Sequence, residues 1–248
     1  MIDIHNHTIY SDGEHMPEEI IKNALEAGIR TLGISDHHRA FFMGSPHYKS
    51  FQEYIKEIDR LKNKYKGRIN ILSGIELNVN FRDKHDEERV PFEVFSSLDY
   101  VLLERIEGML THEDKHENAI GFKDIGRIAE RIPCRLGLAH TDILTHAKIL
   151  NKDIDYILNI MKKYNIFWEL NVQHQYLYFD ELINNRENDE VRMLMNKIHK
   201  YRIEVIAGSD THDIKYDFDI NRLKMANEFI EDNILGEIYF VVKNNRGM

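Results

Sequence analysis

The chain begins with IDIHNHTIYSDG (residues 2–13), where Ile2 and Ile4 alternate with polar residues and lead into His5 and His7. Such alternation indicates a β-strand, in which residues two apart point to the same side. The two imidazoles would therefore project together, as two ligands of one metal ion must. The pair alone only suggests a metal site, so the rest of the chain has to supply the remaining ligands.

Short apolar runs alternate with helical patterns along most of the chain. In residues 16–29, Pro17 lies near a helix start, acidic residues fill the first turn and Gly28 marks a stop. Strands that alternate with helices predict an α/β protein built from parallel βα units. Seven strands with roughly as many helices favour a closed or nearly closed barrel over an open doubly wound sheet. The expected strands cover residues 2–7, 31–35, 69–77, 100–106, 136–139, 167–172 and 204–209, and the expected helices cover residues 16–29, 51–67, 122–132, 153–165, 188–202 and 220–233.

The chain length of 248 residues suits one large core and matches the usual size of a (β/α) barrel. No Pro-, Gly- or Ser-rich linker and no low-complexity run divides it, which predicts a single domain over residues 1–248. Residues 78–98 are less regular than the rest and are expected to form a long loop with a short helix.

Charge and cysteine content restrict the partners and the compartment that we expect. The formal net charge of −9 argues against long nucleic acid as a partner, since proteins that coat it usually present a basic face. Cys134 is the only cysteine, which excludes an internal disulfide and a cysteine-based metal cluster and fits the reducing cytoplasm. No apolar stretch of about 18 residues and no signal-peptide pattern occurs, so neither a membrane span nor secretion is expected.

Histidines and carboxylates follow five of the expected strands, at the barrel end where βα barrels carry their chemistry. The same form recurs in GISDH, SGIEL, LGLAH and AGSDTH: an apolar run, a small residue, then a histidine or an acid. Placing so many titratable groups together at one rim would cost free energy unless cations lay among them. Without a thiolate, imidazole and carboxylate ligands favour Zn²⁺, Mn²⁺ or Fe²⁺ over Mg²⁺ alone. The residues concerned are His5, His7, Asp12, Asp36, His37, His38, Glu76, His140, Asp210 and His212.

The motifs HNHTIYSDG, ISDHH, LAHTD and GSDTH, with the glutamate of GIEL, resemble those of the PHP superfamily, named for polymerase and histidinol phosphatase. They follow one another in the family's order across residues 5–212 and so cover nearly the whole chain. The set is specific for the superfamily but not for a substrate. The resemblance implies a distorted (β/α)7 TIM-like barrel, two or three divalent metal ions, and phosphoester hydrolysis as the usual reaction.

The resemblance also implies three neighbouring metal positions at one mouth of the barrel. The ligands that it implies are His5, His7 and Asp210 for the first metal, His140 for the second, with Glu76 as the bridge between these two, and His37, His212 and Asp12 for the third. His15 is a rival of Asp12 for the third position, although its spacing from His7 fits less well.

One position departs from the family pattern. The segment LDYVLLERIEG resembles the start of a strand that usually ends in a histidine ligand of the second metal, but Ile106 stands where that histidine would be. Glu104 and Glu107 are nearby carboxylates that can substitute for it, and Glu107 is nearer the strand end. A surface position is the alternative for each of them.

Two metals about 3.5–4 Å apart can activate a water and clamp the phosphoryl oxygens during an in-line displacement. We expect Glu76 to bridge such a pair and Asp210 to complete the first metal site. Arg39 and Arg105 are candidates for binding the phosphoryl group, because arginine makes planar, bidentate contacts with phosphate. A surface position is the alternative for both arginines. His38 is expected either to contact the substrate or to orient the histidine before it.

Other polar residues near strand ends have structural explanations. Asp36 is a candidate partner for a ligand imidazole, whereas Asp142 and Asp213 are expected to cap helices or loops. His112 and His116 in THEDKHEN have a ligand-like spacing, but they lie in a charged run with no strand before it. This run is therefore expected to be a solvated loop.

The function that we expect is metal-dependent hydrolysis of a small phosphorylated molecule, with a phosphomonoesterase of the histidinol-phosphatase type favoured. The enzymatic alternative is a nucleotide phosphodiesterase or DNA-end nuclease. A non-catalytic PHP-like scaffold or subunit is an alternative of another class, but a scaffold need not keep all these ligands. Hydrolysis of a C–N bond would call for a lysine that bridges two metals, and no expected strand end offers one.

Overall fold

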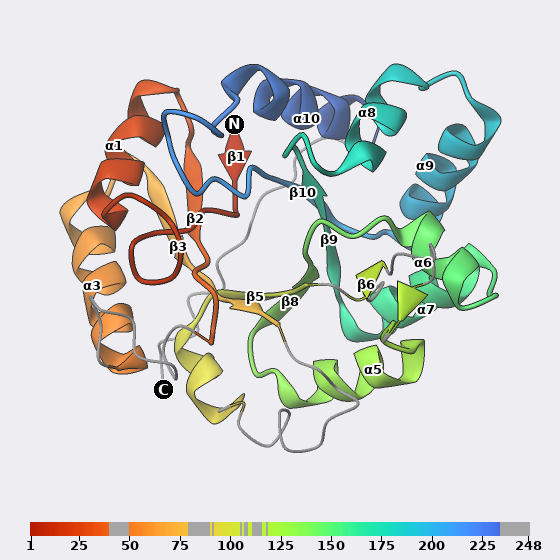
Figure 1. Cartoon of the computed structure of the whole chain (residues 1–248), viewed down its shortest axis with the longest axis horizontal. Coiled ribbons are helices and arrows are strands. Elements are labelled where there is room, and N and C mark those ends of the chain that lie inside the picture. The colour runs from red at the N-terminus through yellow and green to blue at the C-terminus, as the bar shows by residue number, and fades with distance from the viewer. Residues whose placement is uncertain are drawn as a thin grey trace.

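The computed structural model describes residues 1–39, 50–78, 90, 92–104, 106, 109–110, 116–117 and 119–233. Their strands form a ring and their helices lie around its outside (Figure 1). The α/β architecture predicted from the sequence is confirmed, in the form of a distorted barrel. Within the described residues, none of the helices has both the length and the apolar character that crossing a bilayer requires.

The strands of the ring are β1 (Ile2–Asp3), β2 (Thr31–Ile34), β3 (Asn70–Ser73), β4 (Glu76–Leu77), β5 (Tyr100–Leu103), β8 (Arg135–Leu138), β9 (Phe167–Asn171) and β10 (Val205–Gly208). They form two parallel sheets, β1-β2-β3 and β10-β9-β8-β5-β4. The chain passes from β3 into β4, which joins the sheets at one edge. At the other edge the Ile4 N–H donates to the Ala207 carbonyl (3.1 Å), so the segment after β1 lies against β10.

Two expectations about strands are corrected by this arrangement. Residues 69–77 were expected to form one strand, but the strand is interrupted at Gly74 and Ile75, so that β3 pairs with β2 and β4 pairs with β5. The region around His116 was expected to be a solvated loop. Instead, β6 (Met109–Leu110) and β7 (His116–Glu117) pair in an antiparallel ribbon, while His112 lies outside the described residues.

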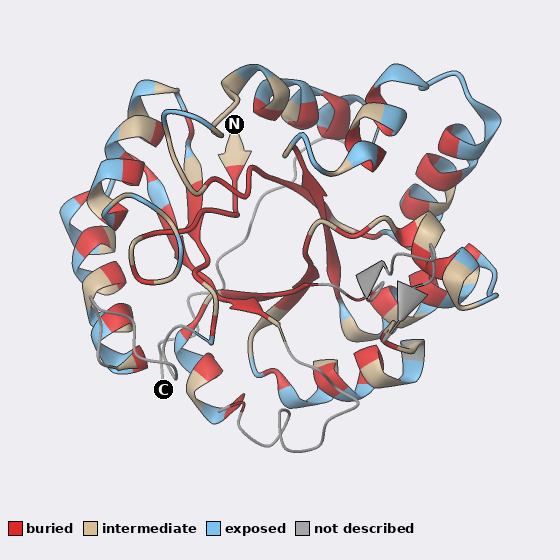
Figure 2. Ribbon diagram, viewed as in Figure 1, coloured by how far each residue is buried: buried red, intermediate tan, exposed pale blue. Residues whose placement is uncertain are grey.

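The helices bury one face against the strands and leave the other to solvent (Figure 2). In the first helix the buried residues are Pro17, Ile20, Ile21 and Ala24, the spacing of one face of an α-helix. The six expected helices are confirmed as α1 (Pro17–Glu26), α3 (Phe51–Lys64), α5 (Phe122–Arg131), α7 (Ile154–Tyr164), α9 (Asp189–Tyr201) and α10 (Ile220–Asn233), and the short helix within residues 78–98 is a 3₁₀ turn (Phe92–Ser97). Two helices were not expected, α6 (Ile143–Ile149) and α8 (Leu177–Asn184).

The interior of the ring is filled by a small apolar cluster that is separate from the main core under the helices. Alternate strand residues supply the two clusters, because successive side chains point to opposite faces of a strand. The interior residues are Ile4, Leu72, Tyr100, Leu102, Ala139, Phe167 and Ile206. This plug closes the barrel below the residues that follow the strands, and it gives the mouth a rigid floor.

The Tyr100 ring crosses the interior of the barrel and donates its hydroxyl to the Ile4 carbonyl. Gly33 makes room for this contact, since a Cβ there would lie 2.5 Å from the Ile4 carbonyl oxygen and closer still to the tyrosine hydroxyl. We expect Gly33→Ala to destabilise the protein by about 1–3 kcal/mol, the usual cost of overpacking. Thermal melting measures this loss, and Glu26→Ala, at an exposed position of α1, is the control. Equal melting temperatures for the two variants would contradict this packing.

Candidate metal centre

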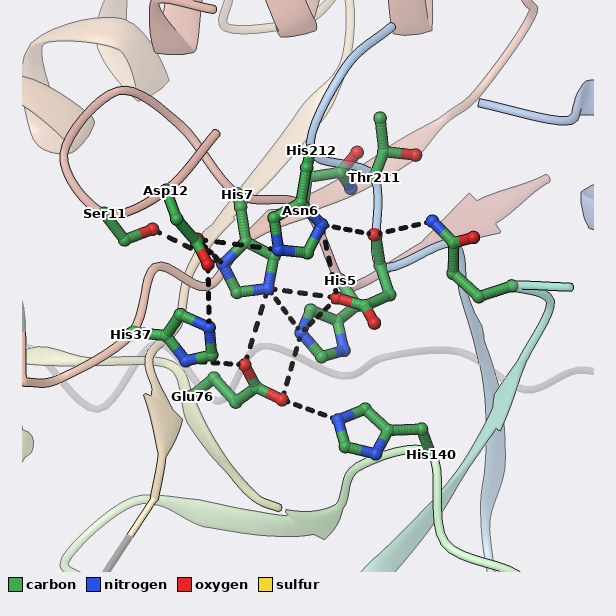
Figure 3. Close-up of polar contacts among 12 residues, drawn as sticks. His5, Asn6, His7, Ser11, Asp12, His37, Glu76, His140, Thr211 and His212 are labelled. Carbon is green, nitrogen blue, oxygen red and sulfur yellow. Dashed lines mark hydrogen bonds and ion pairs between the residues drawn. The ribbon is translucent and has the colours of Figure 1, made fainter. Parts of the chain in front are cut away.

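The histidines and carboxylates that follow the strands meet at one mouth of the barrel (Figure 3). Among the described residues, three groups have ligand atoms within 4.8 Å of one another. The groups share members, so they form one continuous cluster. They consist of His5, His7 and Asp210; His7, Asp12, His37 and His212; and His37, Glu76 and Glu104.

The first group is buried and its donor atoms converge on one point. The Nε2 atoms of His5 and His7 lie 3.0 Å apart. Both face Oδ1 of Asp210, at 3.4 Å and 3.1 Å respectively. Two imidazole nitrogens and a carboxylate oxygen make a donor set that suits a divalent transition metal. The three residues that the resemblance assigned to one metal therefore have the geometry to hold one.

Glu76 lies at the centre of the cluster and is 1% exposed. Its Oε1 is 2.8 Å from His140 Nε2 and 3.5 Å from His5 Nε2. Its Oε2 is 2.9 Å from His37 Nδ1 and 3.4 Å from His7 Nε2. Each oxygen thus faces a different pair of imidazoles, which is the arrangement that a bridging carboxylate needs.

The group around Asp12 is nearer to solvent, since this side chain is 53% exposed. Its Oδ1 lies 3.4 Å from His7 Nδ1 and 3.5 Å from His212 Nε2, and its Oδ2 lies 3.3 Å from His37 Nε2. His15, the rival candidate, contacts Asp213 at 3.0 Å and belongs to none of the three groups found among the described residues.

The position of the absent histidine is filled by apolar packing. Ile106 is 0% exposed and belongs to the main hydrophobic core. Glu104 directly follows β5, is buried, and places Oε1 3.4 Å from His37 Nδ1. Of the two carboxylates considered as substitutes, Glu104 therefore lies in the cluster, whereas Glu107 is outside the described residues.

Two members of the cluster have unusual backbone conformations. His140 has φ of 32° and Asp210 has φ of 54°, in the left-handed region that residues other than glycine rarely adopt. Each lies two residues beyond the end of a barrel strand, β8 for His140 and β10 for Asp210. Backbone strain of this kind persists where the surroundings fix it, and it concentrates at functional sites.

Charges within the cluster determine its protonation when no metal is bound. Burial lowers the pKa of His5, but the charges of Glu169, Asp210 and Glu76 outweigh it and hold that pKa well above its usual value. Burial likewise opposes the effect of Glu76 on His140, whose pKa still rises to about 9. Against burial, the imidazoles hold the pKa of Glu76 well below its ordinary range and lower that of Asp210 to about 2. Without metal, protons on the imidazoles therefore balance the negative charge of the carboxylates. Bound cations would displace these protons, so the residues fit a group of divalent ions.

Glu169 is a buried carboxylate that the sequence analysis missed. Its Oε1 lies 2.8 Å from His5 Nδ1, and its Oε2 accepts a hydrogen bond of 2.6 Å from the His140 backbone N–H. One side chain of β9 therefore orients residues that follow β1 and β8. A charged residue inside the apolar run FWELNV was the available signal, because a carboxylate is rarely buried without a partner.

We expect Glu169→Gln to lower metal affinity 10- to 100-fold, the usual effect of losing a partner that orients a ligand imidazole. The amide keeps the shape of the side chain but loses the charge that faces the His5 ring. Mn²⁺ titration of the chelator-stripped protein measures the change, and Glu204→Gln is the control, because Glu204 pairs with Arg135 and belongs to none of the ligand groups found among the described residues. Unchanged affinity in Glu169→Gln would remove this role.

Asp36 also supports the cluster from outside it. It accepts hydrogen bonds from the Thr8 N–H (2.8 Å), the Thr8 hydroxyl (2.9 Å) and the Ser11 hydroxyl (2.6 Å). These bonds hold the loop that carries Asp12. The sequence suggested that Asp36 is a direct partner of a ligand imidazole. In the structure its hydrogen bonds position this loop instead.

The remaining candidates lie at the rim of the barrel mouth or form hydrogen bonds with the backbone. His38 is buried and its Nδ1 accepts the Asn78 N–H at 3.2 Å, while the exposed Arg39 donates from Nε to the Asn78 carbonyl at 3.2 Å. Asp142 caps α6, as expected, by accepting the N–H groups of two residues in its first turn. Arg105 lies outside the described residues.

Comparison with known proteins shows the family of this chain. The family model of the PHP domain matches residues 3–236. The chain therefore belongs to the PHP domain family.

Individual relatives are more distant. The chain is 29% identical over 86 residues to a histidinol-phosphatase of Lactococcus lactis subsp. lactis strain IL1403, an alignment that covers 34% of this chain and 32% of that protein. It is 22% identical over 225 residues to the DNA polymerase/3'-5' exonuclease PolX of Bacillus subtilis strain 168, which covers 86% of this chain and 34% of that protein. The alignments thus span about a third of the length of each of these curated relatives.

Among solved structures, the histidinol phosphate phosphatase of Lactococcus lactis in complex with zinc, L-histidinol and phosphate has a TM-score of 0.55 to this chain. The two are 16% identical, and the superposition covers 94% of this chain and 93% of that one. At this identity the likeness shows a shared fold, which agrees with the distorted barrel described above.

Proposed function

We propose that this protein is a metal-dependent phosphoesterase that hydrolyses a small phosphomonoester. The observation that carries the proposal is the gathering of donor atoms from most of the barrel strands in one cluster around the buried Glu76. The ligands proposed for two or three Zn²⁺, Mn²⁺ or Fe²⁺ ions are His5, His7, Asp12, His37, Glu76, Glu104, His140, Asp210 and His212.

Divalent ions held by these residues would supply positive charge for the phosphoryl oxygens and lower the pKa of an attacking water. The chain's own part is to fix where this happens. Glu76 reaches both sides of the cluster, through separate oxygens that face His140 and His37. The rigid floor of the barrel holds these side chains in place before any substrate binds, so little reorganisation is needed during the reaction.

Substrate binding at the rim is assigned to the loop after β2. Arg39 is exposed there, and its Nε–H bond to the Asn78 carbonyl fixes the direction of the guanidinium. His38 holds the same loop segment through the Asn78 N–H, so we propose that it positions Arg39 rather than touching the substrate. A planar guanidinium at this edge suits a phosphoryl or carboxylate group of a small ligand.

The similarity to the PolX protein, over 86% of this chain, favours a second candidate, hydrolysis of nucleotide diesters or DNA ends. The net charge of −9 speaks against long nucleic acid, because such substrates bind mainly through lysine and arginine contacts to phosphates. A small phosphomonoester needs no extended basic surface, so it remains the first choice.

A hydrolysis screen on metal-loaded protein tests the proposal, with inorganic phosphate measured for the monoesters and chromatography of the products for the diester and the DNA, because diester hydrolysis releases no inorganic phosphate. The panel should contain histidinol phosphate, other small phosphomonoesters, a nucleotide diester and a DNA oligonucleotide with a free 3' end. The bound metal ions should be counted by mass spectrometry. We expect two or three ions per chain and turnover of monoesters. Turnover of the diester or DNA alone would favour the second candidate. Bound metal without any turnover would indicate a scaffold, and protein that binds no metal would overturn the proposal.

A further inference from the structure

Tyr176, on the loop between β9 and α8, contacts two of the proposed metal ligands, Asp210 and His140. The loop also holds the backbone of this region, since Gln173 Nε2 donates to the Asp210 carbonyl at 2.9 Å. Neither residue was among the candidate metal ligands or catalytic residues taken from the sequence. The loop therefore belongs to the metal centre in space, although it supplies none of the proposed ligands.

The hydroxyl of Tyr176 donates to Oδ2 of Asp210 at 3.3 Å. The other oxygen, Oδ1, is the one that faces His5 and His7. The two carboxylate oxygens thus have separate partners, and the tyrosine selects which oxygen is presented to the metal position. The carboxylate alone would be free to rotate about its last bond, because terminal torsions of Asp are broad.

The ring of Tyr176 stacks on the ring of His140, with centroids 4.6 Å apart and planes 4° from parallel. His140 also faces His5, with centroids 5.8 Å apart and planes 19° from parallel. The stacked Tyr176 ring therefore holds the His140 imidazole in the plane that directs Nε2 to Glu76. Both residues that Tyr176 contacts have left-handed backbones, so their side-chain directions depend on such contacts.

We propose that Tyr176 is a positioning residue that holds His140 and Asp210 in their ligating orientations and so couples two metal positions. The inference rests on the proposed metal-dependent function and extends it to a residue outside the ligand set. Its neighbour Tyr178 shows the contrast: it is buried, and its hydroxyl bonds to the backbone at Asn171 and Glu169, which is the pattern of a structural tyrosine.

Two substitutions separate the parts of this role. Tyr176→Phe keeps the stacked ring and loses the hydroxyl, so it should weaken Mn²⁺ binding at the position that uses Asp210 about tenfold and leave the others unchanged. Tyr176→Leu loses both contacts and should weaken two positions by a similar factor. Titration of Mn²⁺ into chelator-stripped full-length protein, followed by the electron paramagnetic resonance signal of free Mn²⁺, gives the number and affinity of the sites.

Leu177→Ala is the matched control, because Leu177 is 70% exposed and lies next to Tyr176 at the start of α8. It should bind Mn²⁺ like the parent, and metal-free Tyr176→Phe should melt like the parent. The proposal is overturned if both tyrosine variants bind Mn²⁺ as the parent does, if Leu177→Ala weakens binding equally, or if the parent binds no Mn²⁺. This experiment measures metal binding. A parent protein that binds Mn²⁺ but releases no phosphate would therefore contradict the proposed reaction and would not affect the test of Tyr176.

Discussion

Replacing Glu76 with glutamine is expected to abolish turnover and remove at least one bound metal ion per chain. The side chain lies within 3.5 Å of four imidazole nitrogens, on His5, His7, His37 and His140, and no other described residue reaches both sides of the cluster in this way. An amide has the same shape but brings a neutral oxygen and an N–H donor to a place that needs two anionic oxygens. We expect metal affinity to fall by more than the 10- to 100-fold that is typical when a residue that only orients a ligand is replaced.

Metal content by mass spectrometry and kcat/KM for the best monoester measure the effect of this change. Glu228→Gln is the control, because Glu228 is an exposed acid of α10 whose nearest charged partner is Lys224 in the same helix. Circular dichroism should show that the Glu76 variant keeps its fold, since the apolar plug of the barrel does not involve this side chain. Full metal content with full turnover in Glu76→Gln would exclude a bridging role.

Much of the site was predictable because its residues follow a positional rule. Parallel strands bring their C-terminal ends to the same mouth, so His5, Glu76, His140 and Asp210 could be placed together without knowing any contact in advance. The resemblance to the PHP superfamily then gave each residue a partner. The structure brings these residues close to one another at that mouth.

The features that the sequence did not reveal depend on pairing over long distances. Glu169 reaches His5 across 164 positions of the chain, and nothing local in FWELNV specifies that partner. Tyr176 lies in a loop whose aromatic residues are as compatible with simple packing as with a role at the metal centre. The break at Gly74 was hidden because apolar residues continue on both sides of it. In each case local propensity is compatible with several structures, and tertiary contacts select among them.

Metal-free protein should lose stability as the pH rises from about 6.5 to about 9, whereas metal-loaded protein should not. In the absence of metal the pKa of His140 is raised to about 9, mainly by Glu76 acting against burial. A raised pKa stabilises the folded state fully below the pKa of the unfolded chain, and this contribution disappears as the pH passes through the folded value. The shift from 6.5 to about 9 corresponds to at most about 3 kcal/mol, or roughly 6–12 °C in Tm for a chain of this size.

The pKa of His5 and that of His212 are also raised, so their contributions have the same sign and are lost in the same direction. Once bound cations replace the protons, these groups no longer titrate in this range. Melting curves at several pH values, with and without chelator, should therefore separate increasingly between pH 6.5 and 9. His199→Gln, which removes an exposed histidine of α9, should show the parent's pH dependence. Parallel curves for the two forms would mean that cations do not replace these protons, and the assignment of the cluster as a metal centre would then fail.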